Sequence, residues 1–293
     1  MNNLPTFSKD DYLCHFGIKE QKWGVRNYQN YDGTLTEEGK KRYYGSRKSK
    51  TTKNSYFSKA EQDVTKALSN DANKLVKEPI DINVVRKRGK LSIQEAYKCS
   101  KLANRLYDNA LKVEPVITKD IIQAVSDSNC KMYGLKHRLK QPTSLAAKIG
   151  SDAKEDNIPF ESAAKSVKDI IRYTAVSDAN NYYKSYNEIK TQLMKKGYSE
   201  TQCKNYFDLY RQGKVMHKAV QSTFKSPDGY LFELQFQTPA SQAAKELKIP
   251  IYEKRRQNGL TDKQKSELEK QMIDLAEQVS DPSYVFNIKT HKS

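Results

Sequence analysis

The segment 230–238 alternates apolar and polar side chains, as a strand with one buried face does. Three apolar residues fall on one face, whereas Glu233, Gln235 and Gln237 fall on the other. A carboxylate held in such a row is a group that acid–base or metal chemistry can use. The same alternation is typical of the solvent-facing side of an antiparallel sheet, so this strand alone leaves both interpretations open.

The elements around this strand must position its polar face. A partner strand is expected at 219–225, because Pro227 and Gly229 supply the dihedral angles of a turn between the two segments. A buried strand is expected at 168–176, which is rich in β-branched residues. Helices are expected where capping residues precede apolar positions at helical spacing, namely at 58–77, from 92, from 118 after a break at Pro115, at 179–196, and from 241 and 261.

The order of these elements is helices, then strand, helix and hairpin, then helices again. This order predicts an α+β fold with a mainly antiparallel mixed sheet packed by helices, a helical N-terminal region and a C-terminal helix. We expect three parts along the chain: a basic leader at 1–56, a domain that includes the N-terminal helices at 57–260, and a C-terminal helix and tail at 261–293.

Three segments resemble the RelA/SpoT-type alarmone synthetases, which are nucleotide pyrophosphokinases, in the order that this family has them. Residues 217–238 match its pattern Tyr-Lys-x-Leu-His-Thr-Thr-Val, a turn, then Glu-x-Gln-x-Arg-Thr. Residues 138–149 are similar to its Arg-x-Lys-x-x-x-Ser-Ile-x-x-Lys-Met segment, and residues 168–171 resemble its Asp-Leu-Ile strand. The resemblance implies a nucleotidyltransferase-like synthetase fold.

The family moves the β,γ-pyrophosphate of ATP onto the 3′-hydroxyl of a nucleotide, which requires positioning, charge neutralisation and a metal ion. The resemblance implies that Asp169 and Glu233 are catalytic and bind the cofactor Mg²⁺, and that Glu233 orients or deprotonates the acceptor hydroxyl. It also implies two sets of binding residues, for which ordinary polar surface is the alternative. The ATP set is Arg138, Lys140, Ser144 and Lys148, and the acceptor set is His217, Lys218, Gln221 and Gln235.

The sequence departs from the family pattern on the acceptor side. His217 stands where the family has a stacking Tyr, Gln221 where it has a His, and Gln237 where it has an Arg. An imidazole stacks on a base with less area than a phenol ring, so the acceptor stays open between a guanine nucleotide, an adenine nucleotide and an RNA 3′ end such as that of tRNA. The family's Arg five positions after the Asp is Thr174 here, and we expect the nearby Arg172 to lie on the opposite pleat.

Bulk composition limits the classes of function. The chain has 52 Lys and Arg against 35 Asp and Glu, and its net charge of +17 predicts attraction to polyanions such as nucleotides, RNA or DNA. The four cysteines are far apart without a CxxC pair, which argues against a zinc site or a disulfide framework and fits a reducing cytoplasm. No run of about 18 apolar residues occurs, so we expect no membrane partner.

The leader resembles one found on diverse bacteriophage proteins, many of them virion-associated. This resemblance rests on residues 15–30 and 32–43. Their basic and aromatic residues with Gly punctuation suit docking on a virion partner or on nucleic acid through residues 15–53, although a flexible tail has the same composition. The resemblance implies a phage-encoded protein that acts in the bacterial host cytoplasm, with or without packaging in the virion.

Two functions follow from these observations. The first is a pyrophosphokinase that modifies the 3′-hydroxyl of a nucleotide or an RNA 3′ end, as a phage-encoded effector or toxin. The alternative is a non-catalytic virion or RNA-binding protein that keeps the synthetase fold as a scaffold. The joint presence of two carboxylates with Arg138, Lys140 and Lys148 favours the enzyme, because a scaffold does not need all five.

Overall fold

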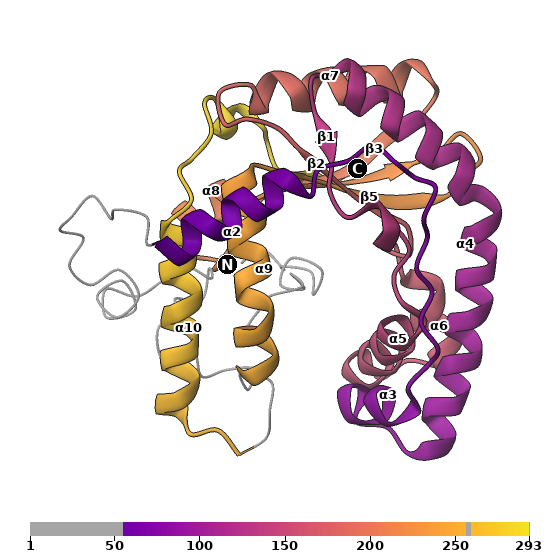
Figure 1. The fold of residues 1–293 in the computed structure, drawn as a ribbon. Helices are drawn as coiled ribbons and strands as arrows, with labels where there is room; N and C mark the ends of the chain where they lie inside the picture. The colour runs from indigo at the N-terminus through magenta and orange to yellow at the C-terminus, as the bar shows by residue number, and fades with distance from the viewer. Residues whose placement is uncertain (1–54, 256–258, 293) are drawn as a thin grey trace, which may run out of the picture.

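A computed structural model describes residues 55–255 and 259–292 of the chain. Nearly all of the expected leader, including the proposed docking segment 15–53, lies outside these residues. The described chain forms one six-stranded sheet packed by helices on both faces (Figure 1). The strands are β1 (Lys131–Met132), β2 (Arg172–Val176), β3 (Ser199–Asn205), β4 (Val220–Lys225), β5 (Leu231–Gln237) and β6 (His291–Lys292).

The helices surround the sheet in two groups. In Figure 1, α7 and the end of α4 lie above the strands. The rest of α4 runs down one side together with α5 and α3, and α9 with α10 descends on the other side. Among the described helices, none is both long and apolar enough to cross a membrane. The helices are α2 (Ser55–Lys66), α3 (Ile82–Gly89), α4 (Ile93–Asp127), α5 (Pro142–Asp156), α6 (Phe160–Ser166), α7 (Tyr182–Lys195), α8 (Tyr206–Arg211), α9 (Pro239–Arg255) and α10 (Asp262–Glu277), with 3-10 turns η2 (Leu135–His137) and η3 (Val285–Asn287).

The sheet has the strand order β1-β2-β5-β4-β3-β6. The pair β2–β5 is parallel, and the other neighbouring pairs are antiparallel. The predicted α+β fold with a mainly antiparallel mixed sheet is therefore confirmed. Strand β3, whose sequence SETQCKN has Cys203 as its one apolar residue, is an element that the sequence did not reveal.

The β4–β5 hairpin forms as the sequence predicts. The amide of Ser226 donates to the carbonyl of Tyr230 at 2.8 Å, and Gly229 has a φ of 85°, a left-handed conformation that glycine adopts without steric cost. The register places Thr223 and Arg172 on either side of Glu233. Residues directly opposite in neighbouring strands share a face, so these three side chains belong to one polar face.

This register corrects the expectation for Arg172. The residue was expected on the pleat opposite to Thr174, but the two positions are two residues apart in β2 and therefore share a face. Arg172 pairs with Glu233, and Thr174 pairs with Gln235. The guanidinium consequently belongs to the polar face.

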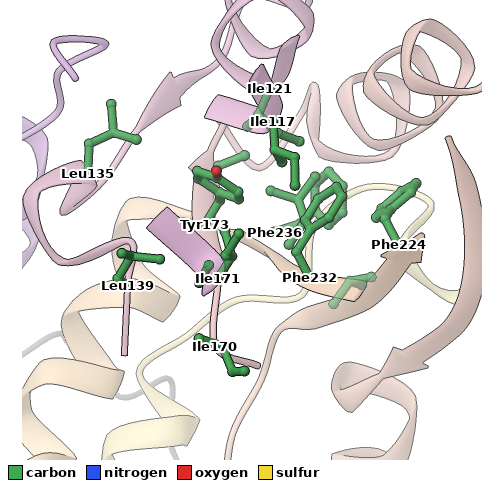
Figure 2. Close-up of a cluster of buried hydrophobic side chains, with 14 of the residues drawn as sticks. Ile117, Ile121, Leu135, Leu139, Ile170, Ile171, Tyr173, Phe224, Phe232 and Phe236 are labelled. Atoms are coloured by element: carbon green, nitrogen blue, oxygen red, sulfur yellow. The ribbon is translucent and has the colours of Figure 1, made fainter. Parts of the chain in front are cut away.

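The other face of the sheet carries the main core. Figure 2 shows Tyr173 and Phe232 among isoleucines of α4, with Phe224 and Phe236 beside them. The rings of Tyr173 and Phe232 meet edge to face with centroids 5.9 Å apart. Aromatic side chains bury large apolar areas, and full burial of each stabilises the fold by about 1.5–3 kcal/mol, which holds the hairpin in register.

Helix α4 is longer than the sequence indicates. Ser92 and Glu95 form the predicted capping box, but the helix then continues through Pro115 to Asp127. A proline inside a helix costs about 3 kcal/mol. Residues such as Ala110 and Ile117 are fully or almost fully buried on both sides of Pro115, and their packing offsets that cost, so the expected break does not occur.

Helix α2 is shorter than the expected 58–77. It ends at Lys66, and the chain beyond it makes hydrogen bonds with other elements. Asn70 donates to the hydroxyl of Ser126 at 2.8 Å and accepts the amide of Met132 at 3.0 Å, which ties the segment to the end of α4 and to β1. Tertiary hydrogen bonds thus outweigh the helical periodicity of this segment.

Candidate active site

Glu233 lies at the centre of the polar face and is only 4% exposed. Its two carboxylate oxygens accept hydrogen bonds from the side-chain amides of Gln221 and Gln235, each at 2.5 Å. Both donors come from the β4–β5 hairpin, in which they lie directly opposite each other. A buried carboxylate is expensive unless such donors satisfy it, so the hairpin itself prepares this position for a charged group.

Lys245 of α9 extends this hydrogen-bond chain. Its ammonium donates to Oε1 of Gln235 at 2.6 Å. An ammonium only donates and a carboxylate only accepts, so the Gln235 amide satisfies both neighbours in one orientation. Burial lowers the pKa of Lys245 to about 8, although the charge of Glu233 acts against that shift.

Asp169 and Lys140 form a buried ion pair just before β2. The ammonium lies 2.5 Å from Oδ2 of the carboxylate, and both residues are about 6% exposed. Two backbone features hold the segments together: the amide of Lys140 donates to the carbonyl of Ile170 at 2.9 Å, and Leu139 bridges to Ile171. Burial lowers the pKa of Lys140, which the Asp169 carboxylate opposes and the nearby positive charges reinforce.

Lys148 of α5 connects the two carboxylates electrostatically. It pairs with Asp152 one turn later at 3.3 Å. Burial acts to lower its pKa, but the charges of Asp169, Asp152 and Glu233 outweigh burial and raise it. Asp169 and Glu233 therefore both act on this one ammonium. Ser144, half-buried one turn earlier on the same helix, completes this side of the predicted site.

Arg138 has other partners. It follows the turn η2 in a helical conformation, with φ −63° and ψ −20°, which breaks the strand-like alternation with Lys140. Its guanidinium makes a buried ion pair with Glu114 of α4 and donates to the carbonyl of Leu135 at 3.0 Å. The structure does not bring Arg138 together with the carboxylates, and its assignment to ATP stays a prediction.

The acceptor set also divides. Gln221 and Gln235 lie at Glu233, whereas His217 packs against the ring of Tyr206 with centroids 4.1 Å apart. Lys218 donates to the carbonyl of Val279 at 2.7 Å and lies 2.8 Å from Asp281. His217 and Lys218 thus contact α8 and the segment after α10.

A second lysine of α9, Lys248, fixes the segment that leads into β4. It is 3% exposed and donates to the carbonyl of Met216 at 2.6 Å. Burial and then the charge of Lys218 lower the pKa of Lys248 to about 7. The hydrogen bond from Lys248 therefore holds the segment that leads into β4, the strand that carries Gln221.

Sequence analysis missed Lys245 and Asp152, and it misplaced Arg172. Asp152 had a signal, because it lies four residues after Lys148, a spacing at which opposite charges pair on one face of a helix. Lys245 had no such signal. Its position depends on how α9 is rotated relative to the sheet, and this is a tertiary property that a single helix sequence does not specify.

The two carboxylates can be tested against the expected Mg²⁺. Within residues 55–255 and 259–292, no three or more His, Cys, Asp or Glu side chains gather as a metal site. Mg²⁺ in nucleotide sites is held by one or two carboxylates together with substrate phosphates and water. Asp169 and Glu233 fit that arrangement, in which the metal arrives with a nucleotide.

Comparisons with known proteins give likenesses of structure alone. The small alarmone synthetase 1 from Bacillus subtilis, solved with its product pppGpp, is 16% identical, with 58% of this chain and 88% of that chain covered and a TM-score of 0.40. The Type VI effector Tas1, solved with its immunity protein, is 15% identical, with 61% and 98% covered and a TM-score of 0.39. A GTP pyrophosphokinase family protein from Streptococcus pneumoniae is 16% identical, with 59% and 84% covered and a TM-score of 0.39.

No protein-family model matches the chain, and no curated protein matches it. Likenesses of this extent support no conclusion about activity, substrate or partner.

Proposed function

We propose that the chain is a pyrophosphokinase that transfers the β,γ-pyrophosphate of ATP to the 3′-hydroxyl of a nucleotide or an RNA 3′ end. The observation that supports the proposal is that four residues drawn from the three motif segments, Lys140, Lys148, Asp169 and Glu233, interact with one another. Asp169 and Glu233 both act on the ammonium of Lys148, and Lys140 is paired with Asp169. Each of these residues belongs to one of the three motif segments.

The reaction makes one bond and breaks one bond. The 3′-oxygen of the acceptor attacks the β-phosphorus of ATP, the anhydride bond between the α- and β-phosphates breaks, and AMP leaves with the released electron pair. The proton of the hydroxyl passes to the Glu233 carboxylate or through it to water. Positioning and charge stabilisation supply most of the catalysis in such transfers.

The chain's own residues divide this work. Lys140 and Lys148 neutralise charge that builds on the phosphate chain and on the leaving AMP. Glu233, clamped by Gln221 and Gln235, is held in one orientation, so it presents an acceptor for the hydroxyl proton at a fixed place. When bound by Asp169 and Glu233, Mg²⁺ supplies Lewis-acid polarisation of the phosphates.

The test is a transfer assay with ATP labelled at the γ-phosphate and a panel of acceptors: GDP, GTP, ADP, ATP and deacylated tRNA. The proposal expects label to move to one acceptor class, with release of unlabelled AMP, only when Mg²⁺ is present. Transfer to no acceptor, or release of free pyrophosphate without an acceptor product, contradicts it.

A role as a phage-encoded effector is a further part of the proposal. It rests on the leader resemblance at 15–43 and on the net charge of +17, which suits an RNA acceptor or docking on nucleic acid. A truncation that removes residues 1–54 tests whether this basic segment is needed for tRNA binding. Equal tRNA affinity of both forms, with the same dependence on salt, contradicts a docking role for the leader.

A further inference from the structure

The cations of the polar face differ in whether the protein already supplies them with a partner. Lys140 is paired with Asp169, Lys148 with Asp152, and Lys245 with Gln235. Arg172 is the exception. Within residues 55–255 and 259–292, its guanidinium makes no hydrogen bond and no ion pair.

The position of Arg172 is fixed by the sheet. It opens β2, its backbone amide donates to the carbonyl of Arg138 at 2.8 Å, and it lies in register beside Glu233. Its neighbours Ile171 and Tyr173 point into the apolar cluster of Figure 2, so alternation directs Arg172 to the opposite, polar face. The side chain is half-buried there.

Arg172 lies among other charges of the polar face. It acts on the pKa of both Lys140 and Lys245 in the direction of repulsion, lowering each, whereas Asp169 acts to raise the pKa of Lys140 and Glu233 acts to raise that of Lys245. The two carboxylates thus already offset part of the repulsion among the three cations. An anion bound beside Arg172 offsets more of it.

We propose that Arg172 binds the phosphate chain of a nucleotide substrate. This inference rests on the proposed function, and it adds a residue to the phosphate site. A guanidinium presents a planar fork of donors that matches two phosphate oxygens, and such paired contacts are among the strong hydrogen bonds of proteins. Its place beside Glu233 puts the bound phosphates next to the group proposed to orient the acceptor hydroxyl.

Binding tests this without any turnover. Isothermal calorimetry with α,β-methylene-ATP, in which the bond that breaks in the reaction is replaced, measures the donor site, and GDP and ADP measure the acceptor site. We expect Arg172→Gln to weaken at least one of these by about tenfold or more, with AMP affected by less than about twofold. A loss confined to methylene-ATP assigns the donor's phosphates, and a loss confined to GDP or ADP assigns the acceptor's phosphates.

The matched control is Arg105→Gln, at an exposed arginine of α4, which should leave all affinities within about twofold. Arg172→Lys keeps the charge and loses the fork, so it should recover only part of the affinity. A melting measurement adds a second readout: inorganic triphosphate should raise the melting temperature of the natural protein more than that of Arg172→Gln.

The outcomes separate this inference from the proposed function. If the natural chain binds methylene-ATP but transfers no pyrophosphate, the proposed function fails and the Arg172 assignment is still decided by the calorimetry. If Arg172→Gln binds every nucleotide as the natural chain does, or if the natural chain binds none, the Arg172 assignment is overturned.

Discussion

Two glutamates are buried on opposite faces of the same sheet. Glu200 of β3 has a side chain only 2% exposed, and it accepts hydrogen bonds from the ammonium of Lys190 at 2.5 Å and from the hydroxyl of Tyr186 at 2.9 Å. Glu233 of β5 accepts from two side-chain amides of the hairpin, also at 2.5 Å. Burial and hydrogen-bond length are alike, but the donors differ in charge and in what else they bind.

The hydrogen-bond donors of Glu200 and Glu233 indicate different roles for the two acids. Lys190 and Tyr186 belong to α7, so Glu200 holds a helix to the sheet and is neutralised in doing so. The amides at Glu233 satisfy its oxygens without adding charge. Within the described part of the chain, the carbonyl oxygen of Gln221 has no hydrogen-bond partner of its own. We therefore expect Glu233, one of whose two donors still presents an unused group, to serve a substrate, and we expect the fully engaged Glu200 to be part of the scaffold.

The same substitution at both acids should sharpen this contrast most. Glu233→Gln keeps the shape of the side chain and removes the charge that the transition state uses, so pyrophosphate transfer should fall by about a hundredfold or more. The affinity for α,β-methylene-ATP should change by less than about threefold. Initial rates and calorimetry on purified protein measure the two effects.

Glu200→Gln is the matched control, since it makes the same chemical change on the other face. Its transfer rate should stay within about threefold of the natural protein at a temperature well below its unfolding midpoint. The contrast is wrong if Glu233→Gln retains transfer within tenfold, or if Glu200→Gln loses as much activity as Glu233→Gln does while remaining folded.

Sequence analysis reached one of these acids and not the other, for physical reasons. Glu233 lies in a strand of strict alternation, and a period of two fixes which residues share a face. Strand β3 has a register shift between Glu200 and Gln202, so alternation does not report the face of Glu200. The hairpin and the polar face were therefore predictable, and the second buried acid was not.

The other errors of the sequence-based predictions also arise from contacts between elements. The break expected at Pro115 was wrong because packing along both halves of α4 outweighs one local cost. Lys245 was missed because the rotation of α9 is set by its packing on α2, α10 and β5. Contacts within one strand or one helical turn could be read from the sequence, whereas contacts between elements required the fold.

Removal of Glu200 should produce the next largest effect, on stability. Glu200→Ala leaves the ammonium of Lys190 and the hydroxyls of Tyr186 and Ser222 without their acceptor. Breaking a buried pair costs about 3–5 kcal/mol, and the partial exposure of Lys190 reduces this, so the free energy of unfolding should fall by about 2–3 kcal/mol. Urea denaturation measures the change.

Glu188→Ala on the same helix provides the comparison for that measurement. Glu188 forms an exposed ion pair with Lys184 at 3.8 Å, and such pairs contribute about 0–1 kcal/mol. Equal losses of unfolding free energy from the two substitutions would show that Glu200 holds α7 no better than a surface ion pair does. The assignment of Glu200 to the scaffold would then be wrong.

A smaller effect is expected at Lys245, which acts on Glu233 through Gln235. Lys245→Met removes the donor that fixes the Gln235 amide, so kcat should fall by about tenfold while the KM for ATP stays within about twofold. Lys245→Arg should restore much of the loss, because it can donate to the same carbonyl. Lys254→Met, at an exposed position of the same helix, should leave kcat unchanged.

The Lys245 result would contradict a positioning role in either of two ways. If Lys245→Met lowers only the melting temperature and leaves kcat unchanged, the lysine is part of the scaffold, like Lys190. If Lys245→Arg is as damaging as Lys245→Met, the donated hydrogen bond is not what matters.

The smallest effect is expected at Lys218, for which the motif and the structural contacts indicate different roles. The motif places this lysine at the acceptor, whereas its ammonium donates to the carbonyl of Val279, pairs with Asp281 and lies 4.9 Å from the centre of the Tyr210 ring. A lysine already engaged in this way resembles Glu200 more than Glu233. Lys218→Met should therefore lower the free energy of unfolding by about 1 kcal/mol, because it removes one hydrogen bond and a half-exposed ion pair.

The acceptor KM decides between the two assignments. Acceptor binding by Lys218 requires that KM rise by about tenfold in Lys218→Met with little change in stability, whereas the scaffold assignment requires the lower stability with KM within about twofold. Lys289→Met is the control in the same C-terminal region, since that exposed lysine donates to the carbonyl of Phe286 at 3.1 Å and should affect neither quantity. If KM rises and stability holds, then an engaged, buried charge can still serve the substrate, and the pattern of partners alone does not distinguish the two faces of the sheet.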